Sequence, residues 1–189
     1  DWKTARAALP YATTSFSMLA FAQIDVLMVS LIESTEFVGR YVPASRLLMV
    51  VGTIGGLAAS AVLPTASRVY ANSSAQEIRA LINESVRGIL LLGGFAALGT
   101  VIVARPAIVT IYGEAYADVS SMLQVGSVYL VFNFATSILA TNLTAIGRQG
   151  DRARSMLLGL AATIILVLAF VPWFGMIGAI SAMVGSELA

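Results

Sequence analysis

Two ionisable residues lie in or beside long apolar stretches, and these are the first places to look for chemistry. Asp25 interrupts the otherwise uncharged run from Ala7 to Ile32, and Arg46 directly precedes the uncharged run from Leu47 to Ser67. A charge at the centre of a bilayer costs on the order of 3 kcal/mol on insertion scales, so such residues commonly serve a function. The carboxylate is suited to taking up a proton or Na⁺, and the guanidinium is suited to attracting an anion.

The spacing of these two residues predicts that they meet across a helical hairpin. Asp25 lies seven residues before Ile32, and Arg46 lies seven residues after Gly39. At a rise of 1.5 Å per residue, each is about 10 Å from the same membrane face. Gln23 adds a neutral hydrogen-bonding group on the same stretch. Two interpretations stay open: a purely structural ion pair, or a pair in which one or both residues face an aqueous cavity.

The composition explains why a membrane is the frame for this chemistry. Of 189 residues, 58% are hydrophobic and 11% are charged, with a mean hydropathy of +0.88. Soluble chains carry roughly a quarter charged residues, so most of this surface is expected to face lipid. The 11 basic and 10 acidic residues nearly cancel, which argues against nucleic-acid binding. The sequence has no His and no Cys, which excludes a Ser-His-Asp catalytic triad and the usual Cys/His zinc sites. No cofactor or metal site is predicted.

Uncharged stretches of about 20 residues indicate membrane-spanning helices. Pro172 and Gly175 divide the long uncharged stretch after Arg154 into two helices, of which the second is expected to be truncated. Ser74 and Glu77 form a capping-box pattern, which predicts a separate short amphipathic helix before the third span. The predicted fold is an all-α membrane protein, a single lobe over residues 1–189 with six helices near residues 7–32, 42–67, 85–105, 117–146, 153–171 and 175–189.

The distribution of Lys and Arg predicts the orientation of this lobe. Short cytoplasmic loops of membrane proteins carry an excess of basic residues. With a cytoplasmic N-terminus, that side receives eight of them, and the other side receives three, Arg40, Arg46 and Arg105. The eight are Lys3, Arg6, Arg68, Arg79, Arg87, Arg148, Arg152 and Arg154.

Several polar and small residues are expected to hold the helices together. Asn133 and Gln124 in the fourth span are typical of hydrogen bonds between membrane helices, and Gly52, Gly56 and Ser60 form a stripe that lets helix backbones approach closely. The arginines around residues 148–154 are interpreted as a loop that sets the orientation. Glu187 is a further intramembrane candidate of undetermined depth.

Four short patterns occur in order on the expected loops and carry a resemblance to a known family. They comprise Gly39, Tyr41, Ala44 and Arg46; Pro64, Ser67 and Arg68; Tyr112, Gly113, Tyr116 and Leu123; and Pro172, Gly175, Gly178, Ala179 and Ala182. Together they resemble the flippases of polysaccharide biosynthesis, in the superfamily that also holds the multidrug extruders and the peptidoglycan-precursor flippase. The resemblance covers essentially the whole chain and corresponds to the C-terminal half of a full-length transporter.

The resemblance implies a non-enzymatic transporter of twelve or more helices, with two lobes around a cavity that opens alternately to either side. The implied substrate is a polyprenyl-pyrophosphate-linked oligosaccharide, moved across the cytoplasmic (inner) membrane for the synthesis of lipopolysaccharide or exopolysaccharide. Its other expected partners are membrane lipids and an N-terminal lobe absent from this sequence. The expected substrate-binding residues are Arg46, Asp25, Arg40, Gln23 and Tyr41.

Two other functions are weighed against this one. A cation-coupled multidrug exporter of the same fold would use Asp25 to take up a proton or Na⁺, although Arg46 argues against a purely acidic cavity. A membrane glycosyltransferase would use Glu33 and Glu36 to hold a metal or act as a base, but the outer loops are short for a catalytic site.

Overall fold

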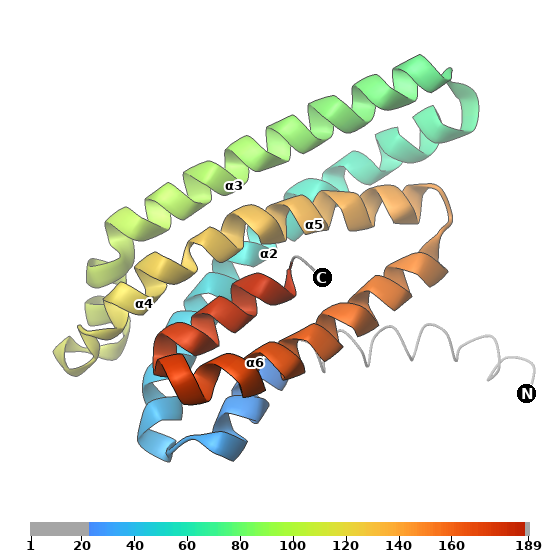
Figure 1. The fold of residues 1–189 in the computed structure, drawn as a ribbon. Helices are drawn as coiled ribbons and strands as arrows, with labels where there is room; N and C mark the ends of the chain where they lie inside the picture. The colour runs from blue at the N-terminus through green and yellow to red at the C-terminus, as the bar shows by residue number, and fades with distance from the viewer. Residues whose placement is uncertain (1–22, 188–189) are drawn as a thin grey trace, which may run out of the picture.

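The computed structural model describes residues 23–187, and this part of the chain is a bundle of long helices without a strand (Figure 1). A first helix occupies Gln23–Ile32, and residues 7–22 of the first predicted span lie outside the described residues. The remaining elements are α2 (Thr35–Asn72), α3 (Ala75–Tyr112), the short helix η1 (Glu114–Tyr116), α4 (Val119–Gly126), α5 (Val128–Ala145) and α6 (Gln149–Ser186).

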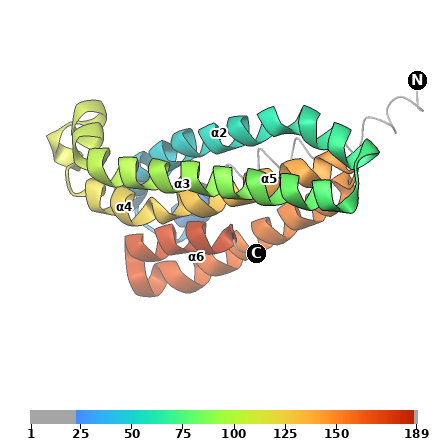
Figure 2. The same cartoon turned by 90° about the horizontal axis from the view of Figure 1, so that it is seen from above.

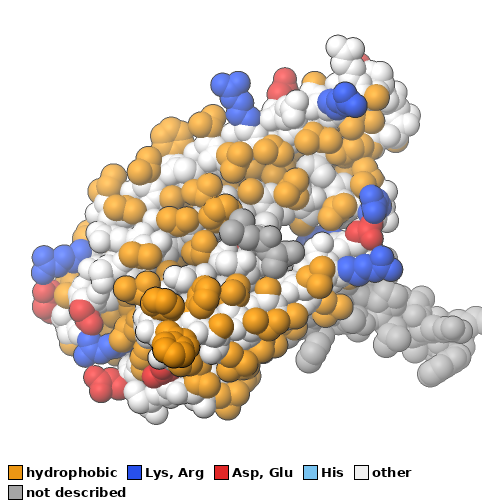
Figure 3. Space-filling model, viewed as in Figure 1, with side chains coloured by type: hydrophobic (Ala, Val, Ile, Leu, Met, Phe, Trp, Pro, Cys, Tyr) orange, Lys and Arg blue, Asp and Glu red, His pale blue; other side chains and the backbone are white. Residues whose placement is uncertain are grey.

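The surface of the bundle confirms a multi-pass membrane protein. Four helical stretches within residues 23–187 are long and apolar enough to cross a membrane, with α4 and α5 together forming one of them. Large apolar side chains point outward, among them Phe95 at 70% exposure and Ile102 at 77%. Figure 3 shows hydrophobic side chains over the middle of the visible face, while the charged side chains gather toward its two ends. This is the pattern that lipid around the middle of the bundle requires.

Two helices begin earlier than the hydropathy predicts because their caps lie outside the apolar stretches. The Ser34 hydroxyl accepts a hydrogen bond from the Phe37 amide at 3.3 Å, so α2 begins at Thr35 and not near residue 42. The predicted capping box of Ser74 and Glu77 is present, but the helix that it begins continues without a break through the third span. The prediction of a separate amphipathic helix is therefore wrong: nothing between it and the span ends the backbone hydrogen bonding.

Helix α5 is central to the packing, since it contacts α2, α3 and α6; it lies between α3 and α6 in Figure 1 and largely behind α3 in Figure 2. The ring of Phe134 on α5 is 1% exposed and lies against glycines of two neighbours, Gly55 on α2 and Gly93 on α3. The packing stripe of α2 is therefore Gly52 and Gly55. Gly56, which was predicted to belong to it, has no neighbour within 4 Å for an added Cβ.

Helix α6 turns back on itself at the predicted break. Gly175 adopts φ 55° and ψ −130°, a conformation that favours glycine, and it divides α6 into a long first arm and a short second arm (Figure 1). A Cβ on Gly178 would lie 2.3 Å from the Phe170 carbonyl oxygen, so the arms meet backbone to backbone. The fourth predicted span is likewise present: Ser127 between α4 and α5 keeps helical angles, φ −57° and ψ −26°, and its amide donates to the Gln124 carbonyl oxygen three residues earlier, so the helix tightens there and continues.

Candidate functional site

The first of two polar clusters inside the bundle contains Asp25. Its side chain is 6% exposed, and Oδ2 accepts a hydrogen bond from the hydroxyl of the fully buried Tyr41 at 2.9 Å. The other carboxylate oxygen, Oδ1, is buried without a hydrogen-bond partner among the described residues. Asp25 therefore contacts the N-terminal part of α2 through Tyr41, whereas the spacing predicted a contact with Arg46.

Arg46 lies beside this pair but is not bonded to Asp25. Its guanidinium donates one hydrogen bond to the side-chain oxygen of Gln23 and a weak one to the Met49 sulfur at 3.9 Å. No carboxylate of the described residues lies within 4 Å of it. The predicted ion pair with Asp25 is thus absent, and Gln23 is the residue that the structure brings to Arg46.

The early start of α2 explains this difference. Measured from Thr35 at 1.5 Å per residue, Tyr41 is about 9 Å and Arg46 about 16 Å along the helix. Asp25, at seven residues before Ile32, remains about 10 Å from the same end, which is the level of Tyr41. The hydropathy estimate of the helix end therefore placed Arg46 about one turn too close to the membrane face.

Arg40 lies near the start of α2, and its ion pairs are with none of the other predicted site residues. It forms ion pairs with Asp118, which precedes α4, and with Glu36 at 3.6 Å. The contact with Asp118 connects the start of α2 to the segment between α3 and α4, whereas Glu36 lies on α2 itself. The described partners of Arg40 are thus two acidic residues, and neither Asp25 nor Arg46 is among them.

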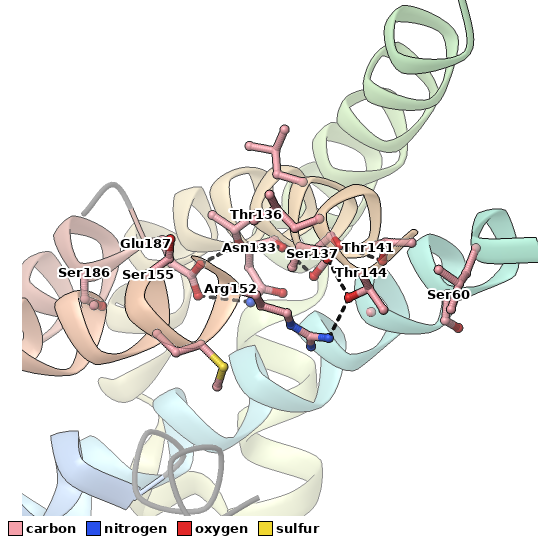
Figure 4. A pocket seen from close by; sticks show the side chains of 17 residues that line it. Ser60, Asn133, Thr136, Ser137, Thr141, Thr144, Arg152, Ser155, Ser186 and Glu187 are labelled. Carbon is pink, nitrogen blue, oxygen red and sulfur yellow. Dashed lines mark hydrogen bonds between the residues drawn. The ribbon is translucent and has the colours of Figure 1, made fainter. Parts of the chain in front are cut away.

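The second polar cluster is a groove of about 680 Å³, here called the α5–α6 groove. It is lined by α2 at Gly56, Ser60 and Leu63, by one face of α5, and by both arms of α6 (Figure 4). The α5 face presents Asn133, Ser137, Thr141 and Thr144, which the helical repeat places in one stripe. Such a run of polar side chains is unusual on a helix that is otherwise apolar enough to span a membrane.

Charged side chains of opposite sign lie at two levels of this groove. Glu187, at the end of α6, accepts hydrogen bonds from the Asn133 amide at 3.0 Å and the Thr136 hydroxyl at 2.7 Å. Arg152, in the first arm of α6, donates to the Thr144 hydroxyl at 3.1 Å (Figure 4). Because Glu187 follows the bend at Gly175 by twelve residues, it lies about 18 Å from that end of the bundle, deep within the apolar region.

A comparison with known families decides what kind of protein carries these clusters. Residues 5–121, well over half of the chain, match the family described as "Polysaccharide biosynthesis protein". The chain belongs to the polysaccharide biosynthesis protein family. The matched region includes α2, with Tyr41 and Arg46, and all of α3.

A relative of this family member is the probable low-salt glycan biosynthesis flippase Agl15 of Haloferax volcanii. The two are 22% identical over 183 residues, which is 95% of this chain and 39% of the relative. The chain thus spans about two fifths of the length of that protein. No solved structure matches the chain.

The α5–α6 groove is the part of the candidate site that the sequence analysis missed. Asn133 and Gln124 do form the predicted bonds between helices, to Glu187 and to the Val101 carbonyl oxygen. The polar stripe on α5 was visible as a helical repeat, but Arg152 was assigned only to an orientation-setting loop. Its place in the groove depends on how α6 packs, and sequence spacing does not contain that information.

Proposed function

We propose that this member of the polysaccharide biosynthesis protein family is a membrane flippase, not an enzyme, and that it moves a polyprenyl-pyrophosphate-linked oligosaccharide across the cytoplasmic membrane. The family and the name of the Haloferax relative support a flippase of glycan biosynthesis. We further propose that the substrate is lipid-linked, that the membrane is the inner membrane, and that the glycan is used for lipopolysaccharide or exopolysaccharide synthesis.

The observation that carries the proposal is the environment of Arg46. Its guanidinium lies about 16 Å along an apolar helix with neutral partners, Gln23 and Met49, and without a carboxylate within 4 Å among the described residues. An arginine stays protonated even when it is desolvated, so this position keeps a positive charge inside the membrane. A pyrophosphate that crosses the membrane needs such a charge, because an isolated anion is very costly in a medium of low dielectric.

The contacts suggest how the anion would be received. A neutral amide competes less strongly for a guanidinium than a carboxylate does, so an arriving pyrophosphate displaces Gln23 and need not break an ion pair. The planar guanidinium then binds two phosphate oxygens at once. Tyr41 meanwhile holds Asp25, which keeps a second acceptor away from Arg46.

The proposal includes a second lobe and an orientation. The chain spans 39% of the Haloferax relative, which is compatible with one lobe of a two-lobe transporter that opens to alternate sides. The end of the bundle with the loops at residues 73–74 and 146–148 carries most of the described arginines, and we place it in the cytoplasm. These arginines are Arg68, Arg79, Arg87, Arg148, Arg152 and Arg154.

One observation favours a second candidate, a cation-coupled multidrug exporter. The Oδ1 atom of Asp25 is buried and has no hydrogen-bond partner among the described residues, so it could accept a proton or bind a cation. In that case Asp25→Asn would abolish transport. The flippase proposal instead gives Asp25 a supporting place beside Tyr41, and Asp25→Asn should impair transport less than a change at Arg46.

Transport per folded molecule tests the proposal in the full-length protein. We expect Arg46→Ala to abolish flipping of a pyrophosphate-linked glycan in proteoliposomes and Arg46→Lys to retain part of it, since lysine keeps the charge without the bidentate geometry. Arg105→Ala is the matched control, because Arg105 is exposed and bonded to Glu114 at 3.3 Å. Full activity of folded Arg46→Ala, or loss of activity only in proportion to loss of folded protein, would contradict the proposal.

A further inference from the structure

We propose that the α5–α6 groove is a saccharide-binding site whose anion-binding end is Arg152. The ligand class is a sugar that carries a phosphate or carboxylate group. The choice of a sugar rests on the proposed function, whereas the anion-binding end rests on the geometry of Arg152 alone. At about 680 Å³ the groove is within the range of roughly 300–1,000 Å³ that is typical of small-molecule sites.

The hydroxyl groups on α5 face the groove as hydrogen-bond acceptors. Ser137, Thr141 and Thr144 each donate their only hydroxyl hydrogen to a backbone carbonyl four residues earlier, at 2.7, 2.9 and 2.9 Å. Their oxygen lone pairs are left to accept, as Thr144 does from Arg152. A row of acceptors about one helical turn apart matches a molecule with several hydroxyl donors along its length, which is the character of a saccharide.

Arg152 supplies the positive end of the site. Of its five N–H donors, the hydrogen bond to Thr144 uses one. The nearby carboxylate of Asp151 is bonded to Arg148 and Arg154, and no carboxylate of the described residues lies within 4 Å of Arg152. Arg152 also lies in the first turn of the long helix α6, where the helix dipole favours an anion. A phosphate or carboxylate in the groove would therefore find a cation whose hydrogen-bonding capacity is largely unused.

Glu187 sets the direction in which a ligand would lie. It is bonded to Thr136, and Arg152 is bonded to Thr144, so the two charges are separated by eight residues of α5, or about 12 Å. At that distance they do not pair with each other. Glu187 repels an anion and accepts hydrogen bonds from sugar hydroxyls, which leaves the Arg152 end as the place for the charged group.

Equilibrium binding to the purified full-length protein tests the site with defined probes. Glucose 1-phosphate and glucuronate represent the two sources of negative charge, and glucose and inorganic phosphate represent each half of the ligand alone. We expect the charged sugars to bind more tightly than glucose or phosphate. Arg152→Ala should weaken glucose 1-phosphate binding by about 10- to 100-fold, the effect of losing a charge-assisted hydrogen bond, and weaken glucose binding less.

Two variants control for charge and folding. Arg154→Ala removes the same charge two residues away, from a side chain that is 82% exposed and bonded to Asp151, and it should bind all four probes as the wild type does. Arg152→Lys keeps the charge and should retain part of the affinity for charged sugars. Equal binding of glucose 1-phosphate by folded Arg152→Ala and Arg154→Ala would overturn the proposal.

Cysteine labelling locates the ligand in the groove. The 189-residue chain has no cysteine, so Ser155→Cys places a thiol on the groove lining, and Ser121→Cys places an exposed control at the far end of the bundle. In a background otherwise free of cysteine, glucose 1-phosphate should slow labelling of the first thiol and leave the second unchanged. Equal labelling rates with and without the sugar at both positions would contradict the site.

These outcomes separate this proposal from the flippase proposal. If the wild-type protein flips the lipid-linked glycan but Arg152→Ala binds sugars normally, the flippase proposal stands and the proposed saccharide site is wrong. If the protein binds glucose 1-phosphate through Arg152 but flips no lipid-linked glycan, the saccharide site stands and the flippase proposal is wrong.

Discussion

Adding one methyl group to Gly55 should destabilise the bundle, while adding it to Gly56 should not. A Cβ at Gly55 would lie 2.6, 2.8 and 2.9 Å from three carbons of the Phe134 ring, whereas a Cβ at Gly56 would meet nothing within 4 Å. Carbon atoms in contact are normally 3.5–4.0 Å apart, so the overlap at Gly55 is about 1 Å. Phe134 cannot easily move away, because Gly93 on α3 lies close to it on another side. A Cβ added at Gly93 would lie only 3.1 Å from the Phe134 Cβ.

The difference between these two variants isolates the packing contribution. Alanine has a higher helix propensity than glycine by up to about 1 kcal/mol, and this gain is common to both positions and cancels. Overpacking a well-filled core costs about 1–3 kcal/mol, and the ring held between two helices places Gly55→Ala toward the upper end. We therefore expect Gly55→Ala to be less stable than Gly56→Ala by about 2–3 kcal/mol.

Reversible unfolding of the purified protein in mixed detergent micelles measures this difference. The neighbouring pair Gly93→Ala and Gly94→Ala repeats the test on α3, since a Cβ at Gly93 would be crowded and one at Gly94 would not. A double-mutant cycle with Phe134→Leu should recover part of the loss in Gly55→Ala, with a coupling of about 0.5–3 kcal/mol. Equal stabilities for Gly55→Ala and Gly56→Ala would refute the packing of α5 between α2 and α3.

Two further predictions concern the buried carboxylate and the bend of α6. Tyr41→Phe removes the only described hydrogen-bond donor to the Asp25 side chain and should cost about 1–3 kcal/mol of stability. The same change should cost less in a protein that already carries Asp25→Asn. An unchanged unfolding midpoint for Tyr41→Phe would contradict the contact. Gly178→Ala would place a Cβ 2.3 Å from the Phe170 carbonyl oxygen and should force the two arms of α6 apart. We expect this variant to be about 1–3 kcal/mol less stable than Gly150→Ala, whose added Cβ would meet nothing within 4 Å. Equal stability of these two variants would show that the arms do not pack in this way.

Local signals in the sequence predicted those features of the fold that depend on neighbouring residues. The capping box of Ser74 and Glu77, the break at Gly175 and the apolar spans all follow from short stretches, and the structure contains each of them. The helix ends were less accurate. Hydropathy marks where lipid begins, but a helix can continue into the headgroup region and beyond, as α2 and α3 do at 38 residues, or about 57 Å.

The inaccurate helix end had a direct consequence for the candidate site. Counting from Gly39 placed Arg46 level with Asp25, whereas α2 begins four residues earlier, at Thr35, which places Tyr41 at that level and moves Arg46 about one turn deeper. A shift of four residues, from Gly39 to Thr35, is small for a fold prediction. For two side chains that must meet within 4 Å across a hairpin, it changes the partner of each.

The same shift alters the chemistry that the proposed function needs. Had Arg46 been paired with Asp25, a pyrophosphate would have had to compete with a carboxylate in a medium of low dielectric, where ion pairs are strong. With Gln23 as its partner, Arg46 keeps its full charge, and the anion exchanges places with a neutral amide. The neutral partner thus makes Arg46 a better receiver of an anion than the sequence alone predicted. The contact between Arg46 and Gln23 therefore supports the proposed flippase function.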